Sequence, residues 1–258
     1  MNHVIFDLEA RLDKRLLRLA FPQLTEGIEF TRFAFDQDKG ETRDATEEER
    51  DAAAYQEFLG RFRLPNGRAP MAPLACHIPI AIAYGQVDGN FNLLGIETKA
   101  VENDLVLDFW RRYEAFDGRL VSFNGRGYDL PLLELHAMKL GLSAPLHMAK
   151  GRNRYRATRH IDLMDQLANY GAVRMDMLRG GLDLIMQFLG GPAKSGIDGS
   201  LVQEYWDAGE LELIAGYCGD DVLRTYILFL RYEMLRGNLG LEQVIALEAA
   251  AMKEFATR

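Results

Sequence analysis

The sequence has 258 residues, of which 48% are hydrophobic and 26% charged, as in an ordinary soluble globular protein with a large core. Its formal net charge of -8 argues against a protein that wraps nucleic acid or coats a membrane by bulk electrostatics, so any nucleic-acid contact must be local. The two cysteines, Cys76 and Cys218, cannot form a disulfide framework. The first residues lack the form of a signal peptide, and no apolar run is long enough to span a bilayer. We therefore expect a cytoplasmic protein that does not engage a membrane.

Hydrophobic periodicity predicts strands early in the chain and helices at its end. Strands are expected at residues 3–8, in two runs joined by the turn Asp88-Gly89-Asn90, at residues 119–125, and in the segment HIDLM that begins at His160. Helices are expected after a capping box of Thr46 and Glu49, at residues 104–115, from Pro131 onward, and at residues 177–189, 201–207, 209–236 and 240–256. This order predicts an α/β layered fold on a mixed sheet.

Two polar segments stand apart from this pattern. Residues 24–75 form an insertion to which the sequence assigns no role. Residues 149–160 concentrate six basic side chains, which fit either a solvated loop or a segment that contacts phosphates. The sequence leaves both interpretations open.

The stretch GYCGDDVLRTY places two adjacent aspartates in a predicted helix. On a helical wheel, Asp220 shares a polar stripe with Arg224 and Arg231, so we expect Asp220 to be an exposed partner of Arg224. Asp221 instead lies in an apolar and aromatic stripe together with Tyr217. A carboxylate there is costly unless a cation or strong hydrogen-bond donors compensate it, so Asp221 requires a functional explanation.

Three further carboxylates stand where an active site could form. Asp7 and Glu9 alternate on the first predicted strand, so both project from one face while Leu8 projects from the other. Asp129 follows a strand and precedes Pro131; taken singly, it is best interpreted as a helix N-cap. A set of carboxylates without a histidine or cysteine cluster favours Mg²⁺ or Mn²⁺ over zinc.

Three motifs in this order resemble a known family. FDLE carries Asp7 and Glu9, NGRGYD carries Asn124, Tyr128 and Asp129, and YCGDD carries Tyr217 and Asp221. Together with their flanking sequence, these motifs resemble the DEDDy subgroup of DnaQ-like 3′-to-5′ exonucleases. The resemblance covers about residues 3–236 and is to stand-alone relatives of the proofreading domain of family B DNA polymerases in particular.

The resemblance implies an RNase H-like fold, with a mixed five-stranded sheet flanked by helices and an extra C-terminal helix, in a single exonuclease domain over residues 1–258. It implies hydrolysis of phosphodiester bonds from the 3′ end of single-stranded nucleic acid, with DNA favoured, to release nucleoside monophosphates. Two divalent cations, Mg²⁺ or Mn²⁺, would be held by Asp7, Glu9, Asp129 and Asp221. Tyr217 would orient the attacking water rather than act as a base, because the ordinary pKa of tyrosine is about 10.

Other residues are expected on the substrate side of the site. Leu8 resembles a position that packs against the terminal base, although a core role is equally compatible with the sequence. Asn124 resembles a residue that contacts the strand or supports the loop before Asp129. The expected substrate-binding residues are Leu8, Asn124, Tyr128, Arg152, Arg154 and Arg156. Asp162 and Asp165 are more simply interpreted as a strand end and a helix cap.

Two alternatives remain at this stage. The polymer could be RNA, since nothing in the sequence indicates which side chain meets a 2′-hydroxyl. The protein could also be a non-catalytic domain that binds a nucleic-acid end, although such domains usually lose one or more of the acids. The sequence does not predict an oligomeric state.

Overall fold

The computed structural model describes residues 1–26, 35–36, 41–42, 44–64, 70–100, 104–155, 158–178, 180–192 and 199–255. Contacts divide the chain into two compact units. One comprises residues 1–10 and 79–258, and the other comprises residues 11–78. The expectation of a single domain over the whole chain stays a prediction.

The larger unit is built on a five-stranded sheet with the order β5-β4-β1-β6-β7. Its strands are β1 (His3–Leu12), β4 (His77–Val87), β5 (Leu93–Ala100), β6 (Arg119–Ser122) and β7 (His160–Asp162). The strand β6 pairs in parallel with both β1 and β7, whereas β4 and β5 form an antiparallel hairpin. The sheet is therefore mixed, as expected.

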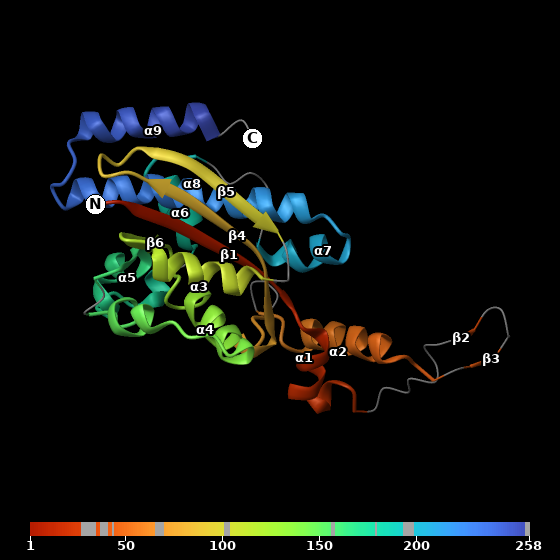
Figure 1. Cartoon of the computed structure of the whole chain (residues 1–258). Coiled ribbons are helices and arrows are strands. Elements are labelled where there is room, and N and C mark those ends of the chain that lie inside the picture. Colours follow the sequence, from red (N-terminus) through yellow and green to blue (C-terminus); the bar gives the residue numbers. More distant parts are fainter. Residues whose placement is uncertain are drawn as a thin grey trace. The chain divides into compact units, whose positions relative to one another are not determined.

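Helices flank this sheet in the larger unit (Figure 1). They are α3 (Leu105–Ala115), α4 (Asp129–Leu140), α5 (Leu163–Leu167), α6 (Gly181–Phe188), α7 (Val202–Asp207), α8 (Leu211–Leu235) and α9 (Leu241–Phe255). Short turns of other helical types lie at His147–Gly151, Asn169–Gly171, Met175–Leu178 and Gly199–Leu201, the first of them π-helical. The long helix α8 contacts β5, and α9 contacts both α8 and β5.

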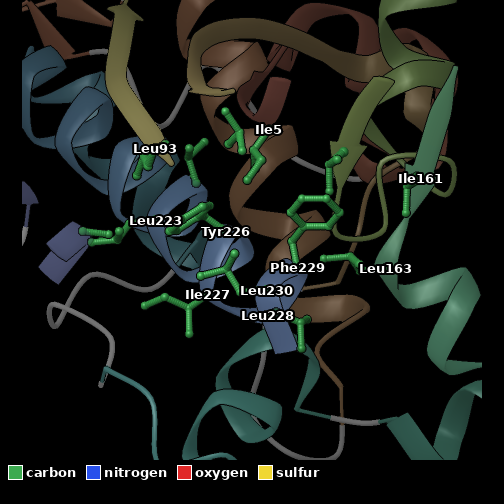
Figure 2. Close-up of a cluster of buried hydrophobic side chains, with 14 of the residues drawn as sticks. Ile5, Leu93, Ile161, Leu163, Leu223, Tyr226, Ile227, Leu228, Phe229 and Leu230 are labelled. Carbon is green, nitrogen blue, oxygen red and sulfur yellow. The ribbon is translucent and has the colours of Figure 1, made fainter. Parts of the chain in front are cut away.

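The main core lies between the sheet and α8 (Figure 2). Ile5 of β1 and Val121 of β6 meet Tyr226 and Phe229 of α8, and all four are fully buried. His3 belongs to the same face of β1, because its ring lies 4.9 Å from that of Phe229. Successive side chains of a strand alternate between faces, so the residues of β1 that share the face of Ile5 point toward α8.

The other face of the sheet is covered by α3. Phe6 of β1 packs against Phe109 of α3, with ring centroids 5.3 Å apart. Trp110 continues this layer, since its indole N–H donates a hydrogen bond to the carbonyl of Leu133 in α4. The strand β1 is thus central to both layers, which explains its run of apolar residues.

The smaller unit contains α1 (Lys14–Ala20), α2 (Glu47–Arg61), a 3-10 turn at Pro22–Leu24 and another at Leu74–Cys76. The short strands β2 (Phe35–Asp36) and β3 (Glu41–Thr42) pair antiparallel. Its core consists of Leu17, Leu24, Ala54, Phe58, Ala72 and Cys76. The capping box of Thr46 and Glu49 is present at the start of α2, as predicted.

The predicted elements agree with the structure except at a few positions. The helix α1 was not expected, and β6 ends at Ser122 rather than at residue 125. The strand expected over HIDLM ends at Asp162, because Leu163 already begins α5. The C-terminal helix lies at Leu241–Phe255, close to its expected range. Among the described residues, no helix combines the length and apolar character that a membrane crossing requires.

Candidate active site

The strand β1 carries the first carboxylates of the site. Asp7 and Glu9 follow Ile5 at intervals of two residues, so they project toward α8, whereas Leu8 projects to the opposite face. The thiol of Cys218, which is fully buried in α8, donates to the backbone oxygen of Asp7 at 3.3 Å and lies 3.7 Å from its carboxylate. Cys218 is thus in contact with the first acid of the site.

The helix α8 brings Asp221 to the same place. Side-chain oxygens of Asp7, Glu9 and Asp221 all lie within 4.8 Å of one another. Tyr217 is one turn earlier on the helix and is buried, with 5% of its surface exposed. Residues separated by more than two hundred positions in the sequence therefore converge on one group of oxygens.

Asp129 is the first residue of α4 and is buried, with 6% exposed. The N-cap of this helix is Tyr128, whose side chain makes no capping hydrogen bond. The interpretation of Asp129 as an N-cap is therefore wrong. Gly125 lets the loop before α4 pass close to β6, because a Cβ at that glycine would lie 2.4 Å from Ser122 Oγ.

Burial and mutual repulsion raise the pKa values of these acids. Burial, followed by the negative charges of Glu9, Asp221 and Asp129, raises the pKa of Asp7 well above its ordinary value. Burial, followed by the charge of Asp162, raises the pKa of Asp129 from its ordinary 3.8 to about 8. Burial also raises the pKa of the Tyr217 phenol, with further contributions from Glu9, Asp221 and Asp7. The phenol therefore keeps its proton at neutral pH.

A buried arginine compensates one side of this negative charge. Arg224 Nη1 donates to Asp221 Oδ1 at 2.8 Å, and its Nη2 lies 2.6 Å from Asp183 Oδ1 of α6. Only 4% of its side chain is exposed. The expected exposed pair of Asp220 and Arg224 is therefore wrong: the guanidinium turns inward, because the carboxylates that can satisfy it lie there.

The donor set fits a hard cation. Carboxylate oxygens from two elements lie within reach of one ion, and no histidine or cysteine joins this group among the described residues. Burial and then the neighbouring negative charges raise the pKa of Asp7, and a divalent cation would neutralise those charges.

The expected substrate-side residues differ in their accessibility. Leu8 is buried, with only 4% exposed, which favours the core role that the sequence left open. Asn124 adopts a positive φ of 66°, a conformation that asparagine tolerates, and its carbonyl accepts hydrogen bonds from Gly127 and Tyr128. Asn124 therefore builds the turn that leads into α4. Tyr128 lies near the acids, since burial and the charges of Asp129 and Glu9 raise the pKa of its phenol.

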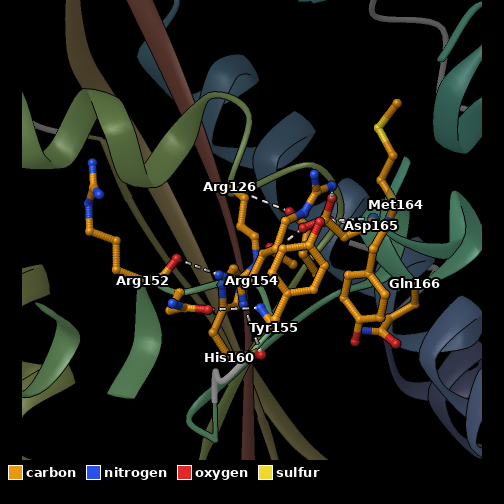
Figure 3. Close-up of polar contacts among 12 residues, drawn as sticks. Arg126, Arg152, Arg154, Tyr155, His160, Met164, Asp165 and Gln166 are labelled. Atoms are coloured by element: carbon orange, nitrogen blue, oxygen red, sulfur yellow. Dashed lines mark hydrogen bonds and ion pairs between the residues drawn. The ribbon is translucent and has the colours of Figure 1, made fainter. Parts of the chain in front are cut away.

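The basic segment lies beside a polar pocket of about 440 Å³. Arg152 Nε contacts both oxygens of Glu134 at 3.1 Å, and Arg154 pairs with Asp165 (Figure 3). Arg126 joins this network: its Nη1 donates to the carbonyls of Gly151 and Arg152 at 2.9 Å. Arg156 lies outside the described residues.

Asp162 connects this pocket with the carboxylates. Its side chain accepts hydrogen bonds from the backbone of Asn124 and Arg126 and caps α5. Asp162 is the last residue of β7, as predicted, but the helix cap expected at Asp165 is wrong, because Asp165 lies inside α5. Asp165 pairs with Arg126 as well as Arg154. Sequence reasoning missed Arg126 and its role as a hub; the only available signal was its position inside NGRGYD.

Comparison with protein families gives a match over residues 70–257 to a family described as a predicted 3′-5′ exonuclease related to the exonuclease domain of PolB. The chain belongs to this family. The activity and the nucleic-acid substrate implied by membership agree with those expected from the motifs. The matched range does not include β1, so the contribution of Asp7 and Glu9 depends on the structure.

Among solved structures, the chain is similar to the family B DNA polymerase from the hyperthermophilic archaeon Pyrobaculum calidifontis, with a TM-score of 0.51 and 15% sequence identity. The match covers 99% of this chain and 29% of the polymerase chain. At this identity the similarity establishes the fold alone, and it confirms the expected α/β architecture. A search of curated proteins gives no match.

Proposed function

We propose that the protein is a metal-dependent 3′-to-5′ exonuclease of the DEDDy type, which releases nucleoside monophosphates from the 3′ end of single-stranded nucleic acid, with DNA favoured. The observation that carries this proposal is the convergence of Asp7 and Glu9 with Asp221, whose oxygens lie within 4.8 Å. Together with Asp129, these residues would hold two divalent cations, Mg²⁺ or Mn²⁺. When bound, such ions supply an acidified water and neutralise charge on the phosphate.

The remaining roles belong to neighbouring side chains. Tyr217 would hold the attacking water by its hydroxyl group, and its elevated pKa excludes it as a general base near neutral pH. Arg224 would hold Asp221 in place through their 2.8 Å contact. Cys218 would fix the backbone of Asp7. We also propose a cytoplasmic location, which the two free cysteines support.

The alternatives are an exoribonuclease and a binding domain without activity. Asp7, Glu9, Asp129 and Asp221 are all present, which supports an enzyme over a non-catalytic domain. DNA and RNA of the same sequence, labelled at the 5′ end, would measure the polymer preference directly. Faster degradation of RNA would replace the DNA proposal by the exoribonuclease.

The adjacent aspartates of α8 provide a matched test. Purified protein with Mg²⁺ or Mn²⁺ should shorten a 5′-labelled single strand one nucleotide at a time from its 3′ end. Asp221→Asn should abolish this ladder, whereas Asp220→Asn should retain it, because only the Asp221 oxygens belong to the carboxylate group. Products that begin at internal positions, or equal activity in the two variants, would contradict the proposed reaction.

A further inference from the structure

An exposed aromatic side chain lies in the middle of the basic segment. Tyr155 has 72% of its surface exposed, although a tyrosine ring usually packs against the protein. The guanidinium of Arg154 lies 5.8 Å from the centre of this ring, as the adjoining side chains in Figure 3 show. The ring of Tyr170 supports it from another side, at a centroid distance of 5.6 Å and an angle of 49°.

Tyr170 is held firmly in this arrangement. Tyr170 adopts a positive φ of 55°, which is unfavourable for a residue with a bulky side chain, and Asn169 before it adopts a φ of 46°, which asparagine tolerates. Gln166 donates to the Tyr170 hydroxyl at 2.8 Å, and Tyr232 of α8 donates to Gln166 at 2.7 Å. The aromatic pair is thereby connected to the helix that carries Tyr217 and Asp221.

The polar pocket beside the aromatic pair is lined by arginines that are paired with the acids Glu134 and Asp165. Arg126, Arg152 and Arg154 line the polar pocket together with Asn124 and Asp162. Asp162 accepts a hydrogen bond from the backbone N–H of Asn124 at 3.0 Å, and Asn124 begins the turn that leads to Asp129 at the start of α4. Arg152 and Arg154 remain accessible despite their ion pairs, with 57% and 38% of their side chains exposed.

We propose that Tyr155, supported by Tyr170 and flanked by Arg154, is a stacking platform for an unpaired nucleobase of the strand whose 3′ end lies at the carboxylates. An exposed aromatic face next to guanidinium groups is the arrangement that binds single strands without reading their sequence. Arg152 and Arg154 would contact the phosphates on either side of the stacked base. The inference rests on the proposed function, because it assigns the path of the strand upstream of the hydrolysed bond.

Binding without hydrolysis tests the platform. A dye-labelled single strand of about twelve nucleotides would be titrated with the full chain in the presence of chelator, with anisotropy as the readout. Tyr155→Ala should raise the Kd about tenfold, whereas Tyr155→Phe should stay within about twofold because it keeps the ring. Phe188→Ala is the matched control, since Phe188 is an aromatic side chain 86% exposed on α6 that does not line the polar pocket, and its removal should not change the Kd.

A fluorescent base analogue locates the contact. With 2-aminopurine at successive positions, stacking should quench one internal position in the wild type and in Tyr155→Phe, and Tyr155→Ala should relieve that quenching. If Tyr155→Ala binds like Phe188→Ala and no position depends on Tyr155, the platform is refuted even if the protein is an exonuclease. If the strand binds in a Tyr155-dependent manner but is not shortened when Mg²⁺ or Mn²⁺ is supplied, the proposed exonuclease activity fails and the platform stands.

Discussion

Replacement of Arg224 by methionine tests how the protein tolerates its concentrated acids. The guanidinium is buried and contacts Asp221 at 2.8 Å and Asp183 at 2.6 Å. Asp221 has only 16% of its side chain exposed and lies within 4.8 Å of the oxygens of Asp7 and Glu9. In the absence of Arg224, the negative charge of Asp221 would stay beside the carboxylates of Asp7 and Glu9 with no guanidinium to offset it.

The magnitude follows from the burial of the partners. Loss of one member of a buried ion pair costs about 3–5 kcal/mol, because the other charge remains in a poorly solvated place. The contact with Asp183 adds little, since 41% of that side chain is exposed. We expect Arg224→Met to lower the free energy of unfolding by about 3 kcal/mol in the presence of chelator.

Urea unfolding would measure this effect against two comparisons. Arg231→Met, which removes a more exposed arginine of α8 that pairs with Glu248 of α9, should cost about 1 kcal/mol or less. The double variant Asp221→Asn with Arg224→Met should recover much of the loss, because the unpaired charge is gone. Saturating Mn²⁺ should stabilise Arg224→Met more than the wild type, since the cation replaces the missing positive charge. The reasoning is wrong if Arg224→Met is no more destabilised than Arg231→Met, or if the double variant recovers nothing.

Further predictions concern pH, water positioning and backbone space. The pKa of Asp129 in the folded protein is about 8, above its ordinary 3.8. Between these two values the folded protein keeps a proton on Asp129 that the unfolded chain has released. The free energy of unfolding, measured in chelator, should therefore fall as the pH rises from about 4 to about 8. Asp129→Asn should flatten that profile, measured by urea titrations at successive pH values, and an unchanged slope would contradict the assignment. Calorimetry should show tighter Mn²⁺ binding as pH rises, since protons compete for the same oxygens. Tyr217→Phe should lower the single-turnover rate about 100-fold with little change in strand affinity, and an unchanged rate would exclude Tyr217 from water positioning. Gly151→Ala should lower the free energy of unfolding by about 1–3 kcal/mol, because a Cβ there would lie 2.0 Å from the Tyr113 hydroxyl oxygen. A melting temperature equal to that of the wild type would contradict this prediction.

The sequence determined the features that depend on local periodicity. The alternation of β1 predicted that Asp7 and Glu9 share a face, and the helical wheel predicted that Tyr217 and Asp221 share a stripe. The capping box of Thr46 and Glu49 was likewise readable, because its hydrogen bonds join residues three positions apart. The order of the motifs indicated the family and therefore the sheet.

Only the tertiary structure decided which partner each charge finds. On the sequence alone, Arg224 has acceptable partners at both Asp220 and Asp221, and the choice was fixed by α6, which brings Asp183 to the inner side of the helix. Asp129 looked like a helix cap until the fold buried it beside Asp162. Local patterns specify the direction of a side chain relative to its own strand or helix, whereas its neighbours come from segments far away in the chain, and burial and pKa follow from those neighbours.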